Sequence, residues 1–223
     1  MKTIPFRLTA VLGFALLVCR FSATADAITN TVTYTPGAVI PDNDPNGISD
    51  THNFSSGIQS ITDIQITLDI SGGYNGDYYA FLRHGTSGFA VLLNRVGATV
   101  GNTSGSSDSG FSIILNDAAS LDVHGASAGG GTLTGIWQPD GRNIDPQLSL
   151  DTTQRNALLN VFNGTSASGD WTLFVADTSA VGIGTLQDWT LSVVGTAVPE
   201  PGVASLLLFG GLTLGAFLLR RRA

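Results

Sequence analysis

Residues 169–194 decide the fold, and they read Gly-Asp-Trp-Thr-Leu-Phe-Val-Ala-Asp-Thr-Ser-Ala-Val-Gly-Ile-Gly-Thr-Leu-Gln-Asp-Trp-Thr-Leu-Ser-Val-Val. On each side of the link 178–184, apolar side chains occupy every second position. A period of two over this length is typical of β-strands that bury one face. We therefore predict two neighbouring strands joined by a glycine-containing loop, with Trp171 and Trp189 buried in a large apolar layer.

Shorter segments upstream are expected to supply the rest of that layer. The clearest is 61–70, where isoleucine and leucine alternate with polar residues. At 152–160, Asp151 and Gln154 form a capping box that predicts one short helix. About nine short strands separated by turns predict an all-β fold, an antiparallel jelly-roll β-sandwich with one short helix. The other predicted strands are 31–34, 78–82, 89–93, 111–115 and 133–137.

The two strand sequences in 169–194 resemble the last two strands of the P domain (P/Homo B). This β-sandwich lies behind the catalytic domain of kexin-like and some bacterial subtilisin-like proteases. The resemblance covers roughly residues 38–195, although Asn75 replaces an Arg that is frequent in the family. Other segments that carry it are Ile40-Pro41-Asp42-Asn43 with Gly47, Ile61-Thr62-Asp63-Ile64, Tyr74-Asn75-Gly76-Asp77, Leu92 with Asn94-Arg95 and Gly97, and Phe162-Asn163-Gly164.

In those proteases the module stabilises or regulates a neighbouring catalytic domain. Only about fifteen residues separate the expected signal peptide from Ile40, so we expect no catalytic domain and no enzyme activity. The sequence has no Ser/His/Asp set with a recognisable local signature, and its three histidines lie in turn-like segments, where we expect solvated side chains. A link to serine endopeptidases is thus by domain analogy only. Trp171, Asp177, Trp189, Gly76 and Asp77 are expected to be structural, with Asp77 as a turn cap.

Residues 1–25 have the features of a secretory signal peptide. They contain a positive start at Lys2 and Arg7, an apolar run at 8–18 and small residues at 23–25. The apolar run is short for a membrane anchor, and Val18 does not suit a lipoprotein signal at Cys19. Because Cys19 is the only cysteine, the mature chain would have neither disulfides nor thiol chemistry.

The segment 26–198 is strongly acidic. It contains sixteen Asp and four Arg with no Glu or Lys, and so carries a net charge of −12. Phosphate backbones would be repelled, which excludes nucleic acid as a partner. An Asp-rich surface suits calcium or simple solubility better.

After Gly195 the sequence changes character. Residues 203–219 are seventeen residues without a charge, and about 1.5 Å per residue makes a helix of them about 26 Å long, enough to cross a bilayer core. Arg220, Arg221 and Arg222 follow and predict a cytoplasmic C-terminus. We therefore predict a C-terminal transmembrane helix.

This tail is similar to the PEP-CTERM sorting signal of Gram-negative bacteria. Residues 198–223 combine the triplet Pro199-Glu200-Pro201, a single span and the basic end. The resemblance implies an exosortase as processing partner, a membrane transpeptidase with a cysteine nucleophile. The chain would first be a membrane-anchored precursor, and cleavage near the triplet would release its ectodomain to the cell surface or extracellular matrix. Plain anchoring by the span is the alternative.

The run Asp42-Asn43-Asp44-Pro45-Asn46-Gly47 fits the beginning of a calcium loop. Asp42, Asp44 and Asn46 place oxygen ligands at alternate positions, and Asp50 stands at the ninth position. Asn53 replaces the expected bidentate Glu, and no flanking helices are predicted. The alternative is a turn between strands. Calcium is the only cofactor that the sequence suggests.

Three functions remain open at this point. The leading one is an exported, non-catalytic module with a role in adhesion, matrix organisation or protein binding. The second is an accessory P domain that acts with a subtilisin-like serine protease. The third is a calcium-dependent glycan-binding module, with extracellular polysaccharide as partner, since jelly rolls host such sites.

The sorting resemblance makes a direct prediction about the mature protein. If an exosortase processes the chain, protein recovered from cells lacks residues 202–223. Intact-mass analysis measures this loss, and a mature mass that retains the tail would contradict the processing hypothesis.

Overall fold

The alternating segments form β-strands in the computed structural model, which describes residues 26–86 and 88–197. The strands are β1 Ala27–Tyr34, β2 Ala38–Ile40, β3 Asp44–Phe54, β4 Ile58–Gly72, β5 Tyr78–His84, β6 Gly88–Asn94, β7 Phe111–Asn116, β8 Leu133–Trp137, β9 Gly169–Asp177 and β10 Gly184–Ala197. Three single-turn 3₁₀ helices lie between them, at Val123–Gly125, Pro146–Leu148 and Leu159–Phe162.

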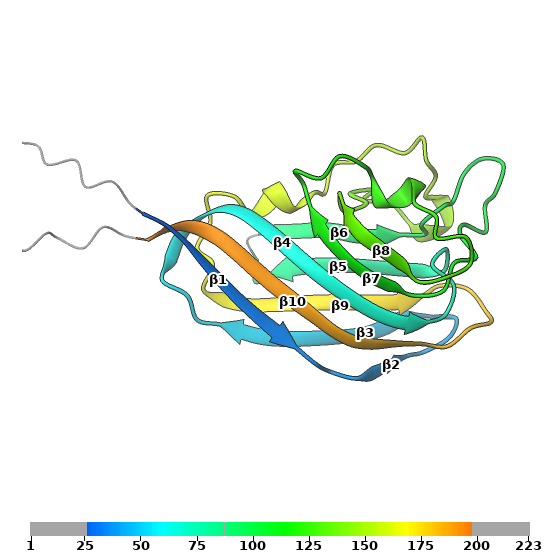
Figure 1. The fold of residues 1–223 in the computed structure, drawn as a ribbon, viewed down its shortest axis with the longest axis horizontal. Helices are drawn as coiled ribbons and strands as arrows, with labels where there is room; N and C mark the ends of the chain where they lie inside the picture. Colours follow the sequence, from blue (N-terminus) through cyan, green and yellow to red (C-terminus); the bar gives the residue numbers. More distant parts are fainter. Residues whose placement is uncertain (1–25, 87, 198–223) are drawn as a thin grey trace, which may run out of the picture. The chain divides into compact units, whose positions relative to one another are not determined.

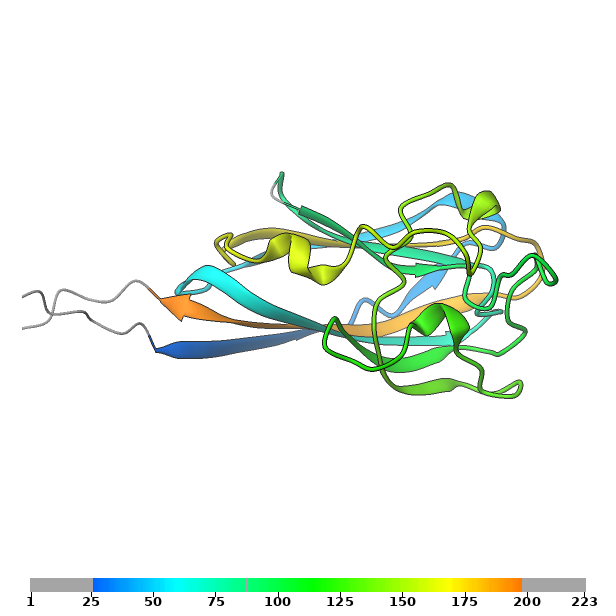
Figure 2. The ribbon, with the colours of Figure 1, turned by 90° about the horizontal axis from the view of Figure 1, so that it is seen from above.

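The strands form two sheets packed face to face (Figures 1 and 2). The larger sheet has the order β1-β10-β4-β7-β8, with β2 also paired to β10, and the smaller has the order β3-β9-β5-β6. Ala27 of β1 lies opposite Thr196 of β10, so both described ends of the chain leave the sandwich at the same end. The all-β sandwich predicted from the sequence is confirmed.

The core lies between the sheets and is filled by alternate residues of each strand. In β4 the inward positions 64, 66, 68 and 70 are isoleucine or leucine and are buried. Trp171 of β9 and Trp189 of β10 are the two largest fully buried side chains. Each indole N–H has a partner, the Ala167 carbonyl at 2.9 Å and the Asp50 carboxylate at 2.7 Å, as a buried indole requires.

The prediction that the strands of residues 169–194 are neighbours is wrong, because β9 and β10 belong to different sheets. β9 pairs with β3 and β5, and β10 pairs with β1, β2 and β4. The link 178–183 carries the chain from one sheet to the other. A period of two identifies the buried face of a strand but not its partner, and stacked sheets lie about 10 Å apart, a gap that a short loop can cross.

Three further details differ from expectation. The turn-rich region that begins at Asp44 forms β3, whose inward side chains include the polar Asp50 and His52. β7 and β8 pair in parallel, so the sandwich is not wholly antiparallel. The predicted helix at 152–160 is wrong: Asp151 begins an isolated turn, and only the 3₁₀ turn Leu159–Phe162 follows.

The predicted signal peptide, residues 1–25, and the predicted transmembrane helix, residues 203–219, lie outside the described residues. Within the described part, no helix has the length and apolarity needed to cross a membrane.

The Trp189 indole makes a measurable prediction. Trp189→Phe removes buried volume and the hydrogen bond to Asp50, so we expect a loss of about 2 kcal/mol in the free energy of unfolding. Trp137→Phe is the control, because Trp137 is only partly buried and bonds within its own strand. Its loss should be below about 1 kcal/mol. Urea denaturation followed by circular dichroism measures both, and equal losses would contradict this role for Trp189.

Candidate functional site

Three aspartates meet at the end of the sandwich opposite to Ala27 and Ala197. Asp177 is the last residue of β9, Asp77 directly precedes β5, and Asp42 precedes β3. The strand register brings them together, because Asp177 lies opposite both Asp44 of β3 and Tyr78 of β5. We call Asp42, Asp77 and Asp177 the aspartate cluster.

Asp177 is the most deeply buried member of the cluster. Its side chain has no exposed surface, and its Oδ1 accepts a hydrogen bond from the Ser179 backbone N–H at 3.1 Å. Its Oδ2 is buried without any hydrogen-bond partner. Burial, together with the charges of Asp77 and Asp42, raises the pKa of Asp177 to about 6, against the lowering effect of the Ser179 and Asn43 backbone amides.

The loop 178–183 connects the three carboxylates. The Ser179 N–H donates to Asp177 Oδ1, and the Ser179 side chain lies beside Asp77 in the lining of the cavity described below. Two residues later, the Val181 N–H donates to Asp42 Oδ2 at 3.3 Å. Val181 has φ +80°, in the left-handed region that a β-branched residue rarely adopts. The loop is thus held in a strained conformation against the cluster.

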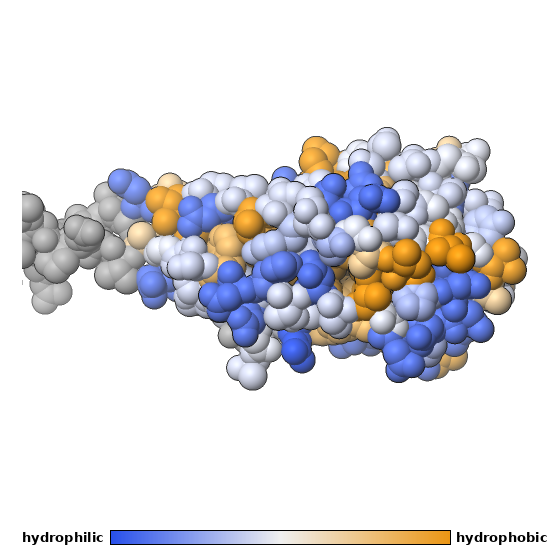
Figure 3. All heavy atoms as spheres, turned by 90° about the horizontal axis from the view of Figure 1, so that it is seen from below, coloured by the Kyte–Doolittle hydropathy of each residue, from blue (hydrophilic) through white to orange (hydrophobic). Residues whose placement is uncertain are grey.

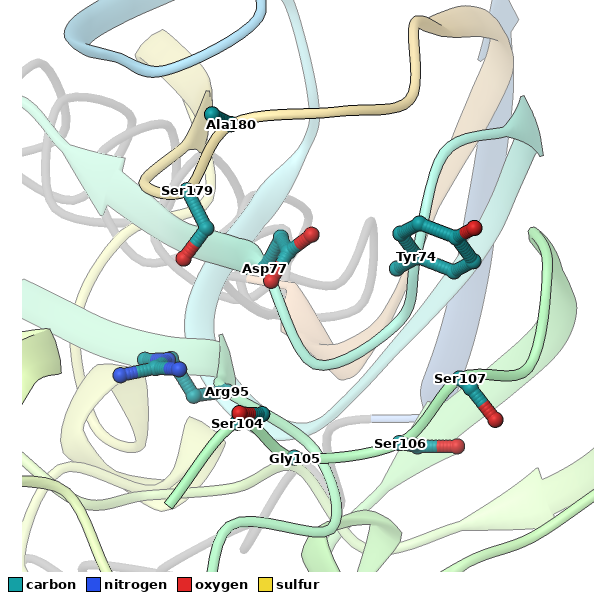
Figure 4. Close-up of a pocket in the computed structure, with 9 residues that line it drawn as sticks. All are labelled: Tyr74, Asp77, Arg95, Ser104, Gly105, Ser106, Ser107, Ser179 and Ala180. Atoms are coloured by element: carbon teal, nitrogen blue, oxygen red, sulfur yellow. The ribbon is translucent and has the colours of Figure 1, made fainter.

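A cavity of about 330 Å³ opens beside Asp77 and Ser179 (Figure 4). Its opposite wall is the loop Ser104–Ser107, and Tyr74 lies at one side. Arg95 also lines it and is almost buried, with N–H groups that donate to the Gly76 and Thr103 carbonyls at 3.0 and 2.8 Å. The cavity therefore joins carboxylate, guanidinium and hydroxyl groups, which suits a polar or ionic ligand.

A second polar cluster is buried between the loops that follow β6 and β8. His124 is 1 % exposed, and its Nδ1 bonds to Asp140 Oδ2 at 2.7 Å while its Nε2 bonds to the Ala98 carbonyl at 2.8 Å. Both ring nitrogens therefore face acceptors. Burial by itself lowers the pKa of His124. The hydrogen bond and charge of Asp140 and the Ala98 carbonyl together raise it by more, so the pKa of His124 lies above its ordinary value. Arg142 bonds to Asp140 and Asp122 at 3.2 and 2.9 Å.

The structure does not gather the four residues of the predicted calcium loop around one point. Asp44 Oδ1 accepts from the Asn46 backbone and side chain, as in a turn. Asp50 points into the sandwich and binds Trp189 and His52. Only Asp42 joins the aspartate cluster. Among residues 26–86 and 88–197, no three acidic or histidine side chains are already assembled around a metal position.

The other predicted site residues lie as follows. A Cβ at Gly76 would meet Ser104 O and Ser106 N at 2.6 Å, so only glycine fits this turn. Asp77 is nearly buried and faces Ser179 and Arg95. The sorting residues 199–201 and 220–222 lie outside the described residues.

The expectation of solvated histidines is wrong for two of the three. His84 is 4 % exposed, stacks on Trp171 with ring centroids 4.1 Å apart, and bonds to two backbone carbonyls. His124 is buried as described above. Only His52 is partly open, and it stacks on Tyr34 at 3.8 Å.

Sequence reasoning missed the grouping of Asp177 with Asp42 and Asp77, as well as the role of Arg95. A signal for Asp177 was present, because the alternation that buries Trp171, Leu173 and Val175 places Asp177 on the same inward face. A carboxylate on a buried face requires a partner or a shifted pKa.

Comparisons with known proteins identify part of the chain. Residues 131–193, which include β8 and β9 and most of β10, match the family model of the proprotein convertase P-domain. The resemblance to this family is therefore confirmed there. No curated protein matches the sequence.

Two solved structures are similar to the chain. The first is a complex of the Aeromonas sobria serine protease with its chaperone, and the second is the serine protease of Aeromonas sobria. Each is 15 % identical. The first has a TM-score of 0.44 and covers 78 % of this chain and 28 % of the protease chain. The second has a TM-score of 0.43 and covers 80 % of this chain and 29 % of the protease chain. The chain thus spans less than a third of the length of these proteases.

The buried His124 predicts how stability depends on pH. The folded state holds the imidazolium more tightly than the unfolded chain, whose His pKa is about 6.5. The stabilisation is therefore complete below about pH 6.5 and is lost as pH rises through the higher pKa of the folded state. Urea denaturation between about pH 6 and 9 should show unfolding free energy falling with pH.

His124→Gln should abolish the dependence above about pH 7, where Asp177 with its pKa of about 6 is already ionised. It should cost about 3 kcal/mol at low pH, because it leaves the Asp140 charge less compensated. His52→Gln is the matched control and should keep the dependence. An unchanged pH slope in His124→Gln would contradict the assignment.

Proposed function

We propose a binding or structural role for this protein, from the premise that residues 131–193 are those of a proprotein convertase P domain, an accessory and non-catalytic module. The family match is the observation that carries the proposal. It includes β9 and most of β10, the strands whose tryptophans fill the core between the sheets. A module of this kind acts through its loops and faces, which the sandwich holds in place.

The surroundings of the described chemical groups agree with a non-catalytic role. A general base needs a substrate proton within reach. His84 and His124 instead direct their ring nitrogens to backbone carbonyls and Asp140 inside the fold. Ser179 lines the cavity beside Asp77, and no histidine is among the cavity residues.

The sequence supports export as part of the proposal. A signal peptide would direct the chain across the membrane, and an exosortase would sort it to the cell surface or extracellular matrix through Pro199-Glu200-Pro201. Because β10 ends next to the beginning of β1, a tail anchored in a membrane would hold the sandwich by that end.

The second candidate is an accessory domain that acts with a subtilisin-like serine protease. The family name favours it. Three exposed aliphatic side chains also suit a protein partner: Val39 of β2, and Val181 and Ile183 of the β9–β10 loop. Val39 pairs with Thr185, at the beginning of β10 next to the loop that carries Val181 and Ile183. Figure 3 shows apolar side chains gathered toward the end of the sandwich away from the described chain ends.

Affinity capture with the purified chain from the secreted fraction tests these candidates. We expect matrix or surface components among the captured material and no peptide hydrolysis by the chain itself. Capture of a serine protease would favour the second candidate. Polysaccharide retention that is lost with a chelator would favour the glycan-binding alternative, and peptide hydrolysis by the pure chain would overturn the non-catalytic proposal.

A further inference from the structure

The strand β1 is an open edge of the larger sheet (Figure 1). Its eight residues pair with β10 on one side in a register without any shift. On the other side no described strand follows, and no backbone hydrogen bond joins β1 to another described segment. A surface hollow of about 480 Å³ lies there, lined by β1 and by residues 53–55. About half of the β1 backbone groups are therefore directed away from β10 without a described partner.

The other three sheet edges are blocked by features that oppose edge-to-edge pairing. β3 contains Pro45 and an irregular register, and it turns the charged Asp50 inward. β6 is covered, because the backbone of residues 140–141 and 157 bonds to it. β8 has only five residues. β1 has none of these features: it is long, regular and free of Pro, Gly and charged residues.

The open edge is also uncharged, although segment 26–198 carries a net charge of −12. No charged residue occurs from 27 to 41. The outward positions of the neighbouring strand β10, residues 190, 192, 194 and 196, are Thr, Ser, Val and Thr. Two copies of an acidic chain repel each other, but along this strip their backbones can approach without bringing like charges into contact. A second copy of the chain therefore suits this edge.

From these observations, we propose that two copies of the chain associate through their β1 strands. A twofold axis between the copies makes the two strands antiparallel and joins the larger sheets into one continuous sheet. With half of its eight residues directed outward, each β1 supplies about four N–H and about four C=O groups, so full pairing makes about eight hydrogen bonds.

The exposed side chains of β1 also fit this pairing. Thr29, Thr31 and Thr33 share one exposed face of the strand. Cross-strand pairs of threonine or serine hydroxyls stabilise neighbouring strands. β1 already makes two such pairs with β10, from Thr31 to Ser192 at 2.9 Å and from Thr33 to Thr190 at 2.7 Å. A second copy of β1 offers the same row of hydroxyls.

One open edge in the described part of each copy limits this assembly to two copies. Pairing uses both β1 edges and leaves only the blocked edges, so the contact closes as a dimer. The contact is one strand wide and smaller than a standard stable interface, so association is weak, with a Kd on the order of 10–100 μM. The proposal goes beyond the proposed function and does not depend on the ligand of the module.

Sedimentation velocity of the purified full chain tests the dimer. Between about 2 μM and about 400 μM, the weight-average mass should rise toward twice that of a single chain. Hydrogen exchange followed by mass spectrometry locates the contact. Peptides over residues 27–34 should exchange more slowly at the higher concentration, because dimerisation protects the outward N–H groups. Peptides over β3 and β8 should exchange at the same rate at both concentrations.

Charged substitutions at Thr31 test the same contact and leave the core intact, because this side chain is exposed. Thr31→Asp and Thr31→Lys should each remain monomeric, since each brings like charges together in the middle of the paired strands. A mixture of the two variants should associate again, because opposite charges then face each other. Recovery in the mixture also shows that both variants are folded.

Thr51→Lys is the matched control. Thr51 is exposed on the edge strand β3, and its hydroxyl pairs with Thr172 at 2.8 Å, as the Thr31 hydroxyl pairs with Ser192. This variant should associate like the wild type.

Four results would overturn the proposal. They are a mass that stays at one chain at about 400 μM, association retained by both Thr31 variants, a mixture of these variants that stays monomeric, and unchanged exchange over residues 27–34 in an associated sample. Loss of association in Thr51→Lys alone would also count against it, because it would place the contact on β3.

Discussion

The burial of one face on each of two central strands is the constraint on which the structure depends. β9 and β10 lie inside different sheets, and each contributes a tryptophan to the shared core. Trp189 also ties the sheets together, because its indole N–H crosses the core to Asp50 of β3. His52 of β3 adds a second link by stacking on Tyr34 of β1. Without disulfides in the described residues, such contacts hold the two layers in register.

The same constraint explains the buried polar groups. Strand ends and the long loops between strands bring aspartates, histidines and arginines inside the fold, where each needs a partner. His84, His124 and Arg142 find theirs in carbonyls and carboxylates. Asp177 Oδ2 and the side-chain oxygens of Asn75 and Asn94 are buried without a hydrogen-bond partner among the described residues. Asp177 and Asn75 both lie at the end of the sandwich where β9 runs into the loop 178–183.

The location of this end matters for a chain whose residues 131–193 match the proprotein convertase P-domain. The strands bring the described ends of the chain out on one side and the aspartate cluster on the other. Loops at the free end of a rigid sandwich are suited to binding, since their backbone can vary without loss of the core. The exposed aliphatic residues at the same end add apolar area next to charge, a combination common at protein contacts.

The sequence by itself determined the fold class, most strand positions and the burial of Trp171 and Trp189, because strand periodicity depends only on local geometry. It also determined the match to the P-domain family at residues 131–193. It did not reveal β3, whose inward Asp50 and His52 are satisfied only by the opposite sheet. Only the tertiary structure decided that β9 and β10 separate into two layers and that Asp42, Asp77 and Asp177 meet. Partners of that kind are set by contacts between residues far apart in sequence, and no local pattern encodes them.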